Sequence, residues 1–295
     1  MMRSKRFSRN SAKLVLCNCF LLALAVSGCS SSPTPTFTKA TVEEAVPRLL
    51  KNEYKQDATA KLVGATLWVY VPVEDMFERP KAPEKYSTKF LIEKNASVVE
   101  AHTLQSQFQI KAIPEKEKEQ EWVIRRQVSE QIGNAWKVIR RVIFSMHPAE
   151  RDAIKFLMLV IADIKNGIEI KEMFYYLDLK KVSYSMISIQ EYQHRIVQDS
   201  GVVLGALKDR KGKHLRYREI LMPEFISRQI EYRINLKFQK PEVEQNADID
   251  KEVRKIVVET LRIYGIRDIT DVQIENLISN ERMVLTAQDI WGSMR

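Results

Sequence analysis

The sequence predicts an α+β fold, with a mixed, mainly antiparallel sheet whose β-hairpins pack against amphipathic helices. Three stretches carry this prediction. Residues 62–73 alternate apolar positions with a period of two, and residues 122–146 repeat them at steps of three and four. Residues 156–179 form two apolar runs on either side of Asn166-Gly167, which is typical of a hairpin with a type I′ turn.

The first part of the folded region is expected to hold one helix and several strands. Thr41 and Glu44 have the spacing of a capping box, but Pro47 interrupts the helical pattern and moves the expected start toward Val46. Residues 62–73 are apolar on both faces, which predicts a central strand. The remaining segments are a loop at 74–87, short strands at 89–92, 98–102 and 108–113, and a solvated charge run at 114–121.

The helix predicted over residues 122–146 has a basic side, which is compatible with a membrane surface but better explained as the solvated face of a core helix. The hairpin that follows carries Asp163, Glu169 and Asp178. Paired carboxylates are able to serve acid/base chemistry, but charges near a turn and on a sheet edge explain these three more simply.

Three further helices and a second hairpin are expected. Ser188 and Glu191 form a second capping-box match, for a helix that Gly201 ends. Residues 223–238 fit a helix with Pro223 at its start, although they also fit a strand. The other expected elements are a loop at 239–248, a helix at 248–264 that Gly265 caps, and a hairpin of 269–278 and 283–290.

The N-terminus has the features of an export signal. Five basic residues precede an apolar run over residues 14–25, which is too short to span a bilayer. Val26-Ser27-Gly28-Cys29 follows this run and resembles a bacterial lipobox, with Val26 in place of the usual Leu. The resemblance implies that cleavage occurs between Gly28 and Cys29 and that Cys29 is lipidated.

An anchor of this kind would attach the protein to a lipid bilayer through acylated Cys29, since two or more acyl chains hold a protein stably on a membrane. Residues 30–36 are Ser, Thr and Pro only, which predicts an extended tether. The resemblance also implies sorting to the outer membrane, facing the periplasm, because Ser30 rather than Asp follows the cysteine.

Cleavage would change the net charge and the number of free cysteines from which a function is inferred. The whole chain has a net charge of +9, but 5 of its 47 basic residues precede Cys29, so 42 face 38 acidic residues in the mature chain. A net charge of about +4 without a concentrated basic patch argues against nucleic-acid binding. Because Cys17 and Cys19 leave with the signal and Cys29 is acylated, disulfides, thiol catalysis and Cys-ligated zinc are excluded.

The sequence contains none of the common catalytic or phosphate-binding motifs. His102, His147, His194 and His214 are far apart in the chain, which indicates surface or hydrogen-bonded histidines rather than ligands. We therefore expect no metal and no cofactor. The loop around Gly212 carries Lys208, Arg210, Lys211 and Lys213, which are candidates for contact with an anionic surface, although a solvated turn explains them as well.

The expected protein is a membrane-anchored lipoprotein of the bacterial cell envelope that binds or assembles a protein partner and has no catalytic activity. A carboxylate-dependent cell-wall or glycan hydrolase is the first alternative, and a carrier of a small apolar ligand is the second. The predicted organisation is a signal peptide (1–28), a tether (29–40), an N-terminal α+β region (41–121), a central helix-hairpin-helix region (122–240) and a C-terminal helix-hairpin region (241–295), with 41–295 as a single domain in the alternative.

Overall fold

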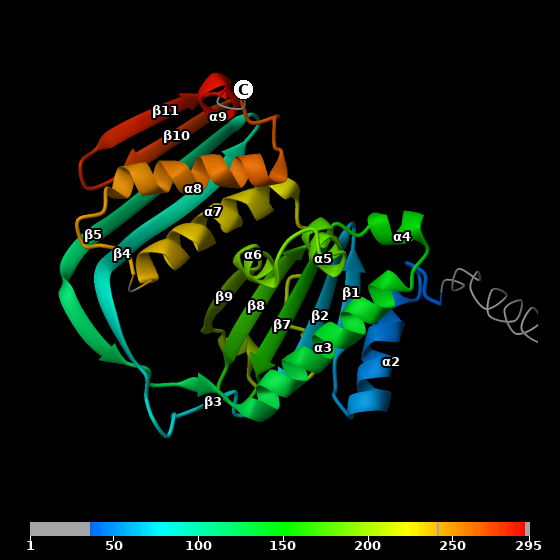
Figure 1. Ribbon diagram of the computed structural model, residues 1–295. Coiled ribbons are helices and arrows are strands. Elements are labelled where there is room, and N and C mark those ends of the chain that lie inside the picture. Colours follow the sequence, from blue (N-terminus) through cyan, green and yellow to red (C-terminus); the bar gives the residue numbers. More distant parts are fainter. Residues whose placement is uncertain (1–35, 241, 293–295) are drawn as a thin grey trace, which may run out of the picture. The chain divides into compact units, whose positions relative to one another are not determined.

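The computed structural model describes residues 36–240 and 242–292, and its elements confirm the α+β class (Figure 1). The lipobox residues, Gly28 and Cys29 among them, lie outside the described residues. The elements are α2 (Val42–Tyr54), β1 (Thr59–Val63), β2 (Thr66–Val73), β3 (Phe77–Glu78), β4 (Lys85–Glu100), β5 (Thr103–Glu119), β6 (Val123–Ile124), α3 (Arg126–Phe144), α4 (Pro148–Asp152), β7 (Phe156–Asp163), β8 (Ile168–Tyr175), α5 (Tyr176–Ser183), α6 (Ile189–His194), β9 (Val197–Val202), η1 (Leu204–Ala206), α7 (Met222–Gln239), α8 (Ile249–Tyr264), β10 (Asp271–Asn276), β11 (Glu281–Thr286) and α9 (Ala287–Trp291).

Five strands form the central sheet in the order β1-β2-β7-β8-β9 (Figure 1). β2 runs parallel to β7, whereas the other neighbouring pairs are antiparallel. β2 and β7 are buried on both faces, as predicted for a central strand. The strand predicted at 62–73 is wrong at its start, because a turn at Gly64, with a φ of 57°, separates β1 from β2. Leu67, Val69 and Val71 point to the face that α2 and α3 cover, while Trp68 and Tyr70 point to the opposite face.

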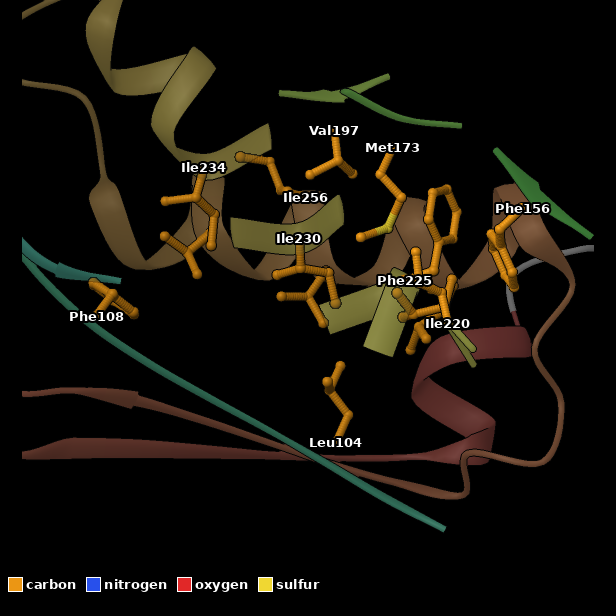
Figure 2. Close-up of a cluster of buried hydrophobic side chains, with 14 of the residues drawn as sticks. Leu104, Phe108, Phe156, Met173, Val197, Ile220, Phe225, Ile230, Ile234 and Ile256 are labelled. Atoms are coloured by element: carbon orange, nitrogen blue, oxygen red, sulfur yellow. The ribbon is translucent and has the colours of Figure 1, made fainter. Parts of the chain in front are cut away.

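The second face of the central sheet packs against α7, which separates it from a second sheet with the order β11-β10-β5-β4. Figure 2 shows Ile230 of α7 between Met173 of β8 and Leu104 of β5, so one apolar core joins both sheets. α8 lies beside α7 and contributes Val253 and Leu261 to the same core (Figure 1). Helices, central sheet, helices and second sheet therefore alternate as layers within residues 37–240 and 242–292.

β4 and β5 form one long hairpin where the sequence predicts three short strands and a loop. The two strands pair out to Lys85 and Glu119, with two register shifts on the way. The charge run at 114–119 is the solvent-exposed end of β5, and Glu117 forms an ion pair of 2.6 Å with Lys85. Opposite charges on facing strands favour pairing even where no apolar face is buried. A prediction from apolar alternation therefore does not detect this part of the hairpin.

The first predicted helix is longer than expected and begins without the predicted capping box. α2 starts at Val42, and the Thr41 hydroxyl accepts a hydrogen bond from the Thr38 amide at 2.9 Å instead of capping the helix. Pro47 lies inside α2, where it removes one helical hydrogen bond. Val46 and Leu50 are fully buried beside it, so their packing compensates for this loss.

The predicted hairpin at 156–179 is confirmed as β7 and β8, but its turn differs from the prediction. Asp163 pairs with Ile168, so four residues connect the strands, and only Gly167 has a positive φ, of 67°. The Asp163 carboxylate accepts hydrogen bonds from the Lys165 and Asn166 amides, both at 3.1 Å. A side-chain acceptor thus replaces the type I′ geometry that Asn-Gly suggests.

The helix predicted from Ser188 to Gly201 is wrong in its second half. Ser188 caps α6 by accepting a hydrogen bond from the Glu191 amide at 3.0 Å, but α6 ends at His194. The following residues form β9, which pairs antiparallel with β8 at the edge of the sheet. Pairing with β8 satisfies the backbone of this polar segment, which has only one buried side chain to support a helix, that of Val197.

The remaining predicted elements agree more closely with the structure. The predicted helix at 122–146 is confirmed as α3, although β6 occupies its first residues, and the helices at 223–238 and 248–264 are confirmed as α7 and α8. Asp248 caps α8, and Gly265 ends it with a φ of 63°. β10 and β11 confirm the second hairpin, but the strand predicted at 283–290 is wrong after Thr286. Residues 287–290 belong to α9, because Thr286 and Asp289 form a capping box that starts a helix there.

Candidate functional site

An open apolar groove lies between α3 on one side and α5 and α6 on the other, next to the end of β8. Its volume is about 880 Å³. The side chains that form its floor and walls are mostly aromatic and aliphatic, and they come from these three helices, from the connection between α5 and α6, from β8 and from the residue before β9. They include Ile132, Trp136, Phe144, Phe174, Leu179, Val182, Tyr184, Ile189, Tyr192 and Ile196.

The walls of the groove are fixed by elements whose own packing is independent of it. α3 buries Val138 and Val142 against the central sheet, which turns Trp136 and Phe144 toward the groove. α5 is joined to α6 by an ion pair of 2.8 Å between Asp178 and Arg195, both largely buried. Burial lowers the pKa of Arg195, but its bonds to carboxylates outweigh this and hold that pKa above the usual value.

Two polar groups lie on the floor of the groove. Glu172 of β8 accepts a hydrogen bond of 3.1 Å from the Trp136 indole, and burial raises the pKa of its carboxyl group. The Tyr192 hydroxyl is buried and has no hydrogen-bond partner among the described residues. Burial also raises the pKa of this hydroxyl. A buried polar group without a partner is costly, so a bound molecule that reached the Tyr192 hydroxyl with a polar group of its own would be stabilised.

The mouth of the groove exposes large apolar side chains. The connection between α5 and α6 presents Tyr184 at 61%, Met186 at 72% and Ile189 at 69% exposure. On the opposite side, α3 presents Lys137 and Arg140. Single exposed apolar residues are ordinary, but three of them within six residues beside an apolar hollow mark an interaction surface.

A second hollow, of about 630 Å³, lies on the other face of the central sheet beneath α7, and we call it the charged cleft. At its base, His214 contacts two carboxylates: Nε2 lies 2.5 Å from Glu169 Oε1, and Nδ1 lies 2.6 Å from Asp209 Oδ2. Lys171 Nζ lies 3.0 Å from the other oxygen of Glu169. The Tyr70 hydroxyl donates to the Asp209 carbonyl at 2.5 Å, which fastens the same loop to β2.

The charged cleft resembles a catalytic site in composition but not in geometry. A general base needs a nitrogen that faces the substrate, and both ring nitrogens of His214 already contact carboxylates. Burial raises the pKa of Asp209, but the His214 ring and the amides of His214 and Lys211 outweigh burial and lower that pKa to about 2. The arrangement therefore holds the 203–218 loop on β8 and leaves neither ring nitrogen of His214 free.

The three carboxylates suggested by the sequence do not form one site. Asp163 closes the β7–β8 turn and accepts from the Met76 amide at 2.7 Å, whereas Glu169 contacts His214 and Asp178 contacts Arg195. Asp163 lies at the turn, as expected. The interpretation of Glu169 and Asp178 as charges on a sheet edge is wrong, because both are at most 1% exposed, β8 is paired on both sides, and Asp178 belongs to α5. Each is buried because it has a hydrogen-bonded or ionic partner of its own.

The basic loop predicted to meet an anionic surface is exposed. Lys208, Arg210, Lys211 and Lys213 all project into solvent, while Asp209 between them is largely buried. Arg210 forms an ion pair of 2.7 Å with Glu74. The other three cations have no ion-pair partner among the described residues, and their contact with an anionic surface stays a prediction.

The four histidines lie at separate places. His102 Nδ1 lies 2.8 Å from the Asp268 carbonyl, His147 caps α4, and the His194 carbonyl accepts from Gln229. In the part of the chain that the structure describes, no three His, Cys, Asp or Glu side chains are grouped as metal ligands. Among the same residues, no helix combines the length and apolarity that crossing a bilayer requires.

Comparison of the chain with protein-family models, curated proteins and solved structures gave no match. A function for the groove therefore has to be inferred from its geometry alone. The groove was not predicted from the sequence, although one signal was present. Trp136 and Phe144 lie outside the core-facing stripe of α3, so the apolar face of α3 is wider than the central sheet covers.

Proposed function

We propose that this protein is a lipid-anchored lipoprotein of the bacterial cell envelope that binds or assembles a partner protein and has no catalytic activity. The observation that carries this proposal is the apolar groove between α3, α5 and α6. Its mouth exposes three large apolar side chains, and its floor holds a hydroxyl without a partner among the described residues. A surface with both features is stabilised when another molecule covers it.

The N-terminal sequence supports the membrane-anchored part of the proposal. Val26-Ser27-Gly28-Cys29 supplies the acylation site, and the Ser/Thr/Pro tract after it supplies a tether. With Ser30 after the cysteine, the proposed location is the outer membrane, facing the periplasm. Such a tether keeps the folded region within a few nanometres of the bilayer, where envelope proteins are its neighbours.

The hydrolase alternative receives less support from the structure. A glycosidase needs two carboxyl groups that flank an open cleft. Glu169 and Asp209 are instead bridged by His214. The carrier alternative is favoured by the 880 Å³ volume of the groove, which suits a small apolar ligand. The polar floor and the rim cations favour a protein partner over such a ligand.

The anchor is tested by Cys29→Ala in the full chain, followed by fractionation of the envelope. We expect the variant to leave the membrane fraction, because it lacks the acyl chains that hold the protein on the bilayer. Ser31→Ala is the matched control and should stay membrane-bound. Unchanged membrane association of Cys29→Ala would contradict the anchor.

A further inference from the structure

The groove has the length of a short helix. Ile132, Trp136, Arg140 and Phe144 line it from α3 at successive steps of four residues. At ~1.5 Å per residue, these positions extend over about 18 Å along α3, or slightly more than three helical turns. The occupant is therefore an elongated body that lies along α3, rather than a compact molecule that fills a round cavity.

The floor of the groove offers no backbone hydrogen bonds to its occupant. β8, which supplies Glu172 and Phe174, is paired with β7 on one side and with β9 on the other. A peptide added as a strand needs an unpaired sheet edge, and none lies on this floor. A peptide in this apolar groove must then satisfy its own backbone groups, which an α-helix does.

The two sides of the groove differ in charge. Lys137, Arg140 and Arg141 stand along the α3 side, and only Arg141 has an ion-pair partner among the described residues, Glu53 at 2.5 Å. The opposite side is lined by uncharged residues, among them Ser183, Tyr184, Ile189 and Gln193. Glu172 on the floor is the one acidic side chain among the described residues that line the groove, and its carboxylate accepts a hydrogen bond from the Trp136 indole.

The floor also argues against a hydrocarbon chain. The Tyr192 hydroxyl has no hydrogen-bond partner among the described residues, and an acyl chain has no group that can supply one. A helix from a protein does so with a polar side chain on the edge of its apolar stripe.

We infer that the groove receives an acidic amphipathic helix of the partner protein. About three turns of this helix lie along α3, apolar residues spaced three and four apart fill the groove, and Asp or Glu residues beside them pair with Lys137 and Arg140. The inference rests on the proposed function, and it adds the chemistry of the partner segment.

The direct test places a photo-crosslinker at the mouth of the groove, as Tyr184→p-benzoylphenylalanine in the full-length, membrane-anchored protein. After irradiation of intact cells, mass spectrometry identifies the adducts. The control is Tyr86→p-benzoylphenylalanine on the β4–β5 hairpin, a site that is 45% exposed and lies outside the groove. We expect one protein to be enriched at position 184, with the adduct in an acidic segment of helical apolar periodicity.

The outcomes separate the inference from the proposed function. A protein adduct in a basic or strand-like segment would overturn the inference alone. An adduct to phospholipid or lipopolysaccharide, without a protein, would overturn both and favour a lipid carrier. The absence of any adduct specific to position 184 would also contradict both.

Charge reversal then tests the pairing. Lys137→Glu with Arg140→Glu should reduce the crosslinking yield at position 184 about tenfold, because like charges across an interface repel. Changing the acidic residues of the captured segment to Lys should restore the yield. Lys116→Glu with Lys118→Glu on the exposed hairpin is the matched control and should leave the yield unchanged. An unaltered yield in the groove variant would overturn the inference.

Discussion

The groove and the charged cleft lie on opposite faces of the same strand, β8, and they differ in how their polar groups are satisfied. In the cleft, Glu169 contacts His214 and Lys171, and His214 contacts Asp209. In the groove, the Tyr192 hydroxyl has no partner among the described residues. The cleft also contains an acceptor without a partner, Asn95 Oδ1, so the contrast rests on the charged groups. Those at the base of the cleft bond to one another, whereas Lys137 and Arg140 beside the groove have no ion-pair partner among the described residues.

This difference reverses the roles that the residue types of the two hollows would suggest. Histidine and carboxylates in a cleft ordinarily suggest catalysis, and an apolar groove of helices ordinarily suggests an incompletely packed core. Here both nitrogens of His214 are engaged, while Tyr184 and Ile189 stand more than half exposed at the mouth of the groove. The following predictions test whether the charged cleft serves stability and the groove serves binding.

The largest effect is expected for His214→Ala in the charged cleft. The substitution leaves the buried carboxylates of Glu169 and Asp209 without their shared partner, and breaking such a pair costs about 3–5 kcal/mol. The free energy of unfolding from urea denaturation measures it. Arg216→Ala, at an exposed position two residues along the same loop, is the control and should change this free energy by less than about 0.5 kcal/mol. A small effect of His214→Ala would mean that the cluster does not hold the loop.

The second prediction concerns acid and Asp209. Its pKa of about 2 lies below the ordinary value of 3.8, so its contribution to stability is present above pH 4 and is lost as the pH falls from about 4 to 2. Asp209→Asn should cost ~2 kcal/mol near pH 6 and progressively less toward pH 2. Urea denaturation at several pH values measures this difference. A cost that does not depend on pH would show that the carboxylate charge is not what stabilises the loop.

The scaffold was more predictable from the sequence than the groove, and for a physical reason. The faces of β2, the β7–β8 hairpin and the C-terminal cap of α8 at Gly265 follow from local periodicity and capping, which neighbouring residues determine. The groove depends on α5 and α6 folding back beside α3, and on the Asp178–Arg195 ion pair that joins them. Such contacts between distant residues leave no periodic signal in one sequence.

The segment after α6 also shows that local signals in the sequence predict less than the whole element. The capping residue Ser188 correctly predicted where a helix begins, because a cap acts within one turn. Where that helix ends was decided by pairing of β9 with β8, a contact across some 25 residues of chain. Likewise, the sequence shows a histidine at position 214, but it does not show that Glu169 and Asp209 contact the ring of His214.

A third prediction reverses the sign of the pH effect on the groove side of β8. The pKa of Glu172 is raised by burial, so its contribution to stability increases as the pH falls through this raised pKa. Glu172→Gln keeps an acceptor for the Trp136 indole and removes the buried charge. At pH 7 the variant should be as stable as the wild type or more stable, by up to about 1 kcal/mol. Urea denaturation at pH 7 and pH 5 tests this, and a marked loss at pH 7 would show that the charge itself is needed.

The smallest expected effect on stability is that of Tyr192→Phe. Because its hydroxyl has no partner among the described residues, the substitution removes no hydrogen bond and should change the free energy of unfolding by less than about 0.5 kcal/mol. Tyr176→Phe is the matched control. Its hydroxyl bonds to Asp152 at 3.2 Å, so its loss should cost about 1 kcal/mol.

The same pair of tyrosines separates binding from stability. If the occupant of the groove uses the Tyr192 hydroxyl, Tyr192→Phe lowers the crosslinking yield at position 184 although the protein is as stable as before, while Tyr176→Phe lowers stability and leaves the yield of the folded protein intact. A hydroxyl that matters for binding and not for folding is what distinguishes the groove from the charged cleft, where His214 is expected to do the reverse. Equal loss of stability in both tyrosine variants would mean that the Tyr192 hydroxyl is satisfied within the folded chain.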